Sequence, residues 1–108
     1  MIDTARIEEL RAEIGGDDLA FIVSVYLDEA RDSLRQIAEG LPPEKHLRML
    51  HFLRSGALNI GLRGIAETAA VLETNDPIDT EGCANRIGEA IARTQAELAS
   101  APVQGRVP

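Results

Sequence analysis

The chain has 108 residues, a formal net charge of −7, one cysteine and no tryptophan. This length allows one domain with a real core, but it leaves no room for a nucleotide-binding kinase domain beside that core. The acidic charge argues against nucleic-acid binding, and the single Cys83 excludes an intramolecular disulfide and a cysteine cluster for zinc.

The composition favours helices, since Ala, Leu, Ile, Glu and Arg dominate and aromatic residues are scarce. No apolar run approaches the roughly 18–20 residues of a membrane span. The first residues lack the hydrophobic region of a signal peptide. We therefore expect a cytoplasmic, free-standing protein that does not enter a membrane.

The first predicted element is a short helix that Asp3 or Thr4 caps and that ends at Gly15 and Gly16. Its apolar side carries Ile7, Leu10 and Ile14.

A long second helix begins at Asp17 and Asp18, where carboxylates favour a helix N-terminus, and it stops at Gly40 before two prolines. Its apolar residues recur at helical steps: Leu19, Ile22, Val23, Tyr26, Ala30, Leu34, Ile37 and Leu41. Phe21 and Val25 lie off this stripe. We expect them to pack under the first helix; the alternative is an apolar patch for a partner.

The third helix opens at Pro43 or Glu44 and closes at Gly61, which suits the left-handed C′ position. One face of this helix is apolar and belongs in a core; it carries Leu50, Leu53, Ala57 and Ile60, with Met49 beside them. His51 points roughly 160–180° away from Leu53 and Ile60, at about 100° per residue. The spacing therefore predicts an imidazole in water.

Two further helices complete the chain. The fourth has Leu62, Ile65, Ala66, Ala69 and Leu72 on its inner face and ends near residues 74–77. Asp79 or Thr80 caps the last, whose buried stripe is Cys83, Ile87, Ala90, Ile91, Thr94 and Leu98. From Ala101 onward, we expect a short disordered tail (101–108) after a domain of residues 1–100.

Four helices with short connections predict an all-α fold, an up-down-up-down antiparallel four-helix bundle with a short extra N-terminal helix. The alternative is a helical hairpin that completes its core only as a dimer. Across the Gly61 turn, His51 and Glu73 should lie at nearly the same level, ~15 and ~18 Å from the bend. They would then sit side by side on adjacent helices.

The helical neighbours of His51 suit an anionic, transiently docked group. They are Leu47, Arg48, Arg54, Ser55 and Leu58. The two arginines could offset the charge of a phosphoryl group, and the two leucines could contact a partner protein. His46 lies about 140° from His51 on the helix, so the two cannot share a face, and we interpret His46 as structural.

The segment from His51 to Gly61 resembles the signature H-x-L-[KR]-G-x-x-x-x-x-G of histidine-containing phosphotransfer (HPt) domains. His51, Leu53, Arg54 and Gly61 match it, whereas Ser55 replaces the usual glycine. The resemblance extends over about residues 3 to 100 as an all-helical layout. It implies a monomeric phosphocarrier, without its own ATP or metal site, that relays phosphoryl groups between aspartates of response-regulator receiver domains.

By this resemblance, His51 is the phospho-accepting residue and Glu73 accepts a hydrogen bond from its Nδ1–H. Arg54, with Arg48 in reserve, stabilises the phosphate; Ser55 affects access to the histidine. The resemblance also implies Mg²⁺ on the partner receiver and no cofactor on this chain. A receiver domain of a hybrid histidine kinase is one possible partner.

Three other hypotheses remain open at this point. The chain could be a transfer-deficient module of the same fold that sequesters a receiver, with Ser55 as its support. It could be a metal-dependent bundle enzyme, although no Glu-x-x-His pair occurs. It could also be a structural dimerising bundle.

Overall fold

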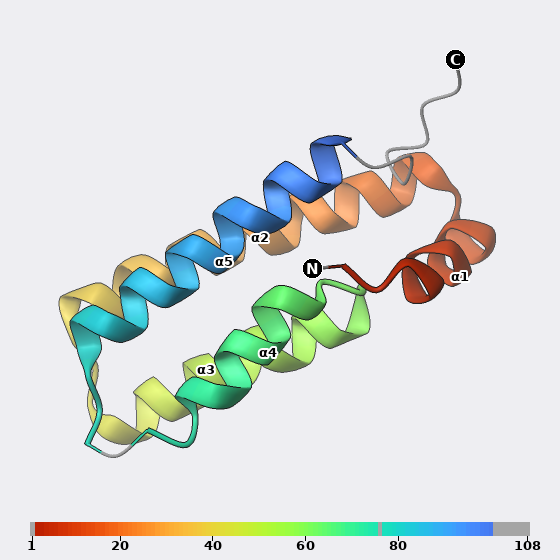
Figure 1. The fold of residues 1–108 in the computed structure, drawn as a ribbon. Helices are drawn as coiled ribbons and strands as arrows, with labels where there is room; N and C mark the ends of the chain where they lie inside the picture. The colour runs from red at the N-terminus through yellow and green to blue at the C-terminus, as the bar shows by residue number, and fades with distance from the viewer. Residues whose placement is uncertain (1, 76, 101–108) are drawn as a thin grey trace.

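The computed structural model describes residues 2–75 and 77–100, and within these ranges it contains five helices and no strand. The helices are α1 (Thr4–Ile14), α2 (Gly16–Glu39), α3 (Pro43–Asn59), α4 (Arg63–Leu72) and α5 (Thr80–Ser100). In Figure 1, α2 to α5 run alternately in opposite directions along an elongated bundle. The predicted all-α helical bundle is confirmed. The tail 101–108 lies outside the described residues.

The core is aliphatic and uses the faces that the helical spacing predicts. On α3, the side chains of Leu50, Leu53 and Ala57 are fully buried. The buried residues of α5 include the whole predicted stripe: Cys83, Ile87, Ala90, Ile91, Thr94 and Leu98. Because α3 turns this face inward, its opposite face is left for solvent.

The turn after α3 also anchors the N-terminus. Gly61 has a φ of 79°, and the Leu62 N–H donates to the Ala57 carbonyl at 2.8 Å, as in a Schellman motif. The Asp3 N–H donates to the Gly61 carbonyl at 2.7 Å, and a Cβ on Gly61 would lie 3.0 Å from Ile7. Glycine is therefore required here both for its backbone conformation and for the close approach of α1.

Side-chain caps begin two of the helices as the sequence predicts. The Asp3 carboxylate accepts from the Arg6 N–H at 3.2 Å at the start of α1, and Asp79 accepts from the Gly82 N–H at 3.0 Å at the start of α5. The fourth helix is shorter than expected. It ends at Leu72, so Glu73 is its C-terminal cap residue rather than part of its last turn.

The expectation for Phe21 and Val25 is wrong. The Phe21 side chain is 69% exposed and Val25 is 40% exposed, so neither packs under α1. The reason is that α1 packs against another side of α2, where Ile7 lies with Leu19 around one groove. Ile22, which the spacing places on the core stripe, is also 40% exposed.

Candidate functional site

His51 lies on the outer face of α3, and its side chain is 64% exposed. The next core residue along the helix, Leu53, is fully buried. The exposure of His51 follows from the helical spacing, since a residue opposite a buried leucine must face water. The imidazole is therefore accessible to another protein.

Arg54 and Glu73 join α3 to the end of α4 beside this imidazole. The Arg54 guanidinium makes a close ion pair with Glu73 through Nε, and its Nη2 lies 3.4 Å from Glu73 Oε1. This hydrogen bond and the carboxylate charge both raise the pKa of Arg54. Glu73 is only 20% exposed, so it is held more firmly than an ordinary surface carboxylate.

The expected hydrogen bond from His51 Nδ1–H to Glu73 is absent from this arrangement. Nδ1 lies 3.8 Å from Glu73 Oε1, which is too long for a hydrogen bond. Arg54 Nη2 instead lies 3.0 Å from Nδ1. The side chains of His51 and Glu73 lie at one level, as the turn geometry predicts, but Arg54 lies within hydrogen-bond distance of both.

Arg48 and Ser55 are helical neighbours of the histidine on α3, at i−3 and i+4. Arg48 is exposed, and within the described residues no ion pair engages its guanidinium. The Ser55 hydroxyl donates to the Phe52 carbonyl at 3.4 Å, so it is turned back toward its own helix. Arg48 is thus available to an anion, whereas Ser55 adds little bulk at the imidazole.

Apolar side chains surround the site at the surface. Leu47 and Leu58 are 42% and 55% exposed, as their spacing predicts. The sequence analysis missed Phe52, which is 42% exposed and whose ring centroid lies 6.5 Å from that of Tyr26 on α2. An aromatic residue next to the histidine, off the core stripe, is the signal that could have identified it.

Exposed apolar side chains also occur on α2, the helix next to Phe52. Phe52 lines a shallow groove with the acidic residues Asp28, Glu29 and Asp32 of α2, and Val25 and Ile22 lie one and two turns before Glu29 on the same face of that helix. We call Phe21, Ile22, Val25 and Phe52 the α2–α3 apolar face. All four side chains are at least 40% exposed.

His46 has a different environment. Its side chain is 2% exposed, and Nε2 lies 3.8 Å from the buried Cys83 thiol of α5. Burial lowers the pKa of His46, so the ring is favoured in its neutral form. This position agrees with a structural role.

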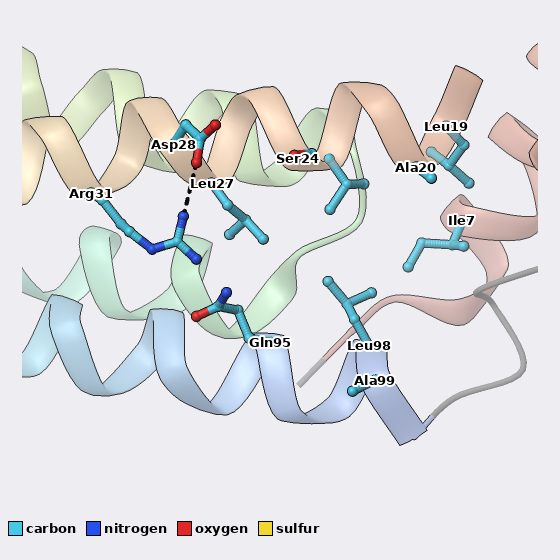
Figure 2. Close-up of a pocket in the computed structure, with 11 residues that line it drawn as sticks. Ile7, Leu19, Ala20, Ser24, Leu27, Asp28, Arg31, Gln95, Leu98 and Ala99 are labelled. Atoms are coloured by element: carbon cyan, nitrogen blue, oxygen red, sulfur yellow. Dashed lines mark hydrogen bonds and ion pairs between the residues drawn. The ribbon is translucent and has the colours of Figure 1, made fainter. Parts of the chain in front are cut away.

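A groove of about 410 Å³ lies elsewhere on the bundle (Figure 2), and α1, α2 and α5 line it. Arg31 and Asp28, both on α2, form an ion pair at 3.1 Å along one wall of it. The lining includes no residue of α3 or α4, so this groove is separate from the His51 site. Within residues 2–75 and 77–100, no group of three or more potential ligands could hold a metal ion.

The described helices include none with the length and apolar character that a membrane span requires. A family model described as Hpt domain matches residues 21–97 of the chain. Comparisons with curated proteins and with solved structures give no match.

Proposed function

Because the chain belongs to the Hpt domain family, we propose that it relays phosphoryl groups between receiver-domain aspartates through a phosphohistidine at His51. Hpt domains are phosphocarrier modules of two-component phosphorelays and are not enzymes in themselves. The observation that carries the assignment of the residue is the exposed His51 imidazole, with the Arg54–Glu73 pair beside it. We further propose that the chain acts in the cytoplasm and as a monomer.

The transfer requires few groups from this chain. The lone pair of His51 Nε2 attacks the phosphorus of an aspartyl phosphate on the receiver. The bond from phosphorus to the aspartate oxygen breaks, and its electrons stay on the carboxylate that leaves. Mg²⁺ would be supplied by the receiver, and the reverse sequence would load another receiver.

Neighbouring side chains would support this step. Glu73 would accept the Nδ1–H of the reacting ring, which leaves Nε2 free and balances the charge that the ring gains. Arg54 and Arg48 would stabilise the phosphoryl oxygens, and both stay charged at any working pH. Leu47 and Leu58 would contact the receiver, and the small Ser55 side chain would leave the approach open.

The test is incubation of the full chain with a phosphorylated receiver. We expect an acid-labile, alkali-stable phosphate on the wild-type chain and none on the His51→Gln variant. The His46→Gln variant, with far-ultraviolet circular dichroism to verify folding, controls for the loss of a histidine and should still be labelled. Label that persists on His51→Gln would refute the assignment. Equal receiver binding by wild type and His51→Gln without any label would instead support a sequestering module.

A further inference from the structure

The Arg54 guanidinium lies within hydrogen-bond distance of the resting His51 imidazole. A guanidinium has only hydrogen-bond donors. Its Nη2 lies 3.0 Å from His51 Nδ1, so Nδ1 must supply a lone pair to this hydrogen bond. A neutral imidazole that accepts at Nδ1 carries its proton on Nε2.

This tautomer is the wrong one for phosphoryl transfer at Nε2, because a protonated nitrogen has no lone pair to attack phosphorus. We infer that Arg54 holds the resting His51 in a tautomer that cannot accept a phosphoryl group, and that an arriving phosphoryl anion releases it. Arg54 is then a positioning residue before transfer as well as a phosphate ligand during it. The functional half of this inference rests on the proposed function.

The geometry provides for the release. Glu73 Oε1 already lies 3.8 Å from Nδ1, so a small rotation would let it accept a hydrogen bond once Arg54 moves. A dianionic phosphoryl group competes with the single carboxylate for the guanidinium. The ring is 64% exposed, so Nε2 can lose its proton to water while Nδ1 gains one.

The step then balances without another reactant from this chain. The Nε2 lone pair forms the bond to phosphorus, and the donor aspartate leaves as a carboxylate. Nδ1 keeps its proton, and the Glu73 carboxylate faces the positive charge that develops on the ring. The competent tautomer is therefore a minor population at rest, and it increases when an anionic group has drawn Arg54 away.

The experiment is nuclear magnetic resonance of the chain with ¹⁵N-labelled histidine at about pH 8.5, where an ordinary imidazole is neutral. The His51→Gln spectrum identifies the His51 signals. In the wild type we expect Nε2 protonated and Nδ1 unprotonated. In Arg54→Ala we expect the Nδ1–H population to rise by about threefold or more, because Glu73 becomes the available partner.

Two variants make the result specific. Arg35→Ala removes an arginine that pairs with the exposed Asp32 on α2, and it should leave the His51 tautomer unchanged. Arg54→Ala combined with Glu73→Ala should lose the gain in Nδ1–H. A wild-type ring protonated mainly on Nδ1, or an unchanged tautomer in Arg54→Ala, would overturn the inference.

The same proteins are then incubated with the phosphorylated receiver. If the expected tautomer shift occurs but His51 is not labelled, the proposed function is contradicted, whereas the contact between Arg54 and the resting His51 is still supported. Normal labelling without a tautomer shift would contradict the inference alone.

Discussion

At the scale of single residues, we expect the buried His46 to make folding sensitive to mild acid. Burial lowers its pKa from the ordinary value of 6.5, so the unfolded chain binds this proton at a higher pH than the folded one. Stability should therefore be complete above about pH 6.5 and should fall as the pH decreases from there toward the lowered pKa. Urea unfolding midpoints at about pH 8 and about pH 5.5 measure this loss of stability. Both pH values lie above the pKa range of ordinary carboxylates, so carboxylate protonation contributes little to the difference.

The His46→Leu variant tests the cause, since leucine cannot take up a proton. Its loss of stability over the same interval should be smaller than that of the wild type. An equal loss in the two proteins would show that other groups cause the pH dependence.

The sequence predicts the direction of some site residues but not their hydrogen-bond partners. The direction of His51 follows from helical periodicity alone, because a residue opposite Leu53 must face solvent. The partner of Arg54 does not follow from periodicity. Glu73 and His51 both lie within its reach, and their competition is decided by side-chain geometry across two helices. The spacing predicts that all three side chains lie close together, but it does not predict which of them are joined by hydrogen bonds.

At the scale of helices, one close contact sets how α2 meets the helix that carries His51. The Tyr26 hydroxyl donates to the Leu53 carbonyl at 2.6 Å, and a Cβ on Gly56 would lie 2.7 Å from the Tyr26 ring. A glycine on the inner side of a helix indicates such a close contact, because glycine there otherwise costs up to ~1 kcal/mol. The sequence pattern does not identify Tyr26 as the neighbour.

The Gly56→Ala variant should therefore destabilise the fold by about 1–3 kcal/mol, despite the better helix propensity of alanine. The buried, hydrogen-bonded Tyr26 ring cannot move aside without losing its contact with Leu53. Urea unfolding gives the free energy. Gly88→Ala is the matched control, since a Cβ there meets only Leu34 at 3.6 Å. That variant should be neutral or stabilised by up to ~1 kcal/mol, and similar losses in both would contradict the role of Tyr26.

The helix boundaries were largely predictable because glycine, proline and capping residues mark them, as at Gly61 and Asp79. The environment of Phe21 was not. Its position off the core stripe is compatible with cover by α1 or with an open surface. Which side of α2 the first helix covers depends on the hydrogen bond between Asp3 and Gly61, which joins residues far apart in the sequence.

At the scale of the whole molecule, an acidic chain exposes a group of apolar side chains near His51. The chain carries a net charge of −7, yet it exposes the α2–α3 apolar face, which has three residues on α2 and, on α3, Phe52 directly after His51. Exposed apolar patches with a polar rim are typical of protein interaction sites. We expect a receiver to dock across this face as well as on Leu47 and Leu58, with the His51 imidazole near the edge of the contact.

The Phe21→Ser variant tests whether the receiver contacts the α2–α3 apolar face, because Phe21 is the most exposed residue of that face, at 69%. The free energy of unfolding should change by no more than about 0.5 kcal/mol, whereas the Kd for the receiver should rise about 3- to 10-fold. Isothermal titration calorimetry measures the affinity. Val71→Ser provides the control, because Val71 is 49% exposed but points away from Glu73 by about 160° at the end of α4. If both variants bind the receiver as the wild type does, the interface does not reach Phe21; if both weaken binding equally, the effect is not specific to the α2–α3 apolar face.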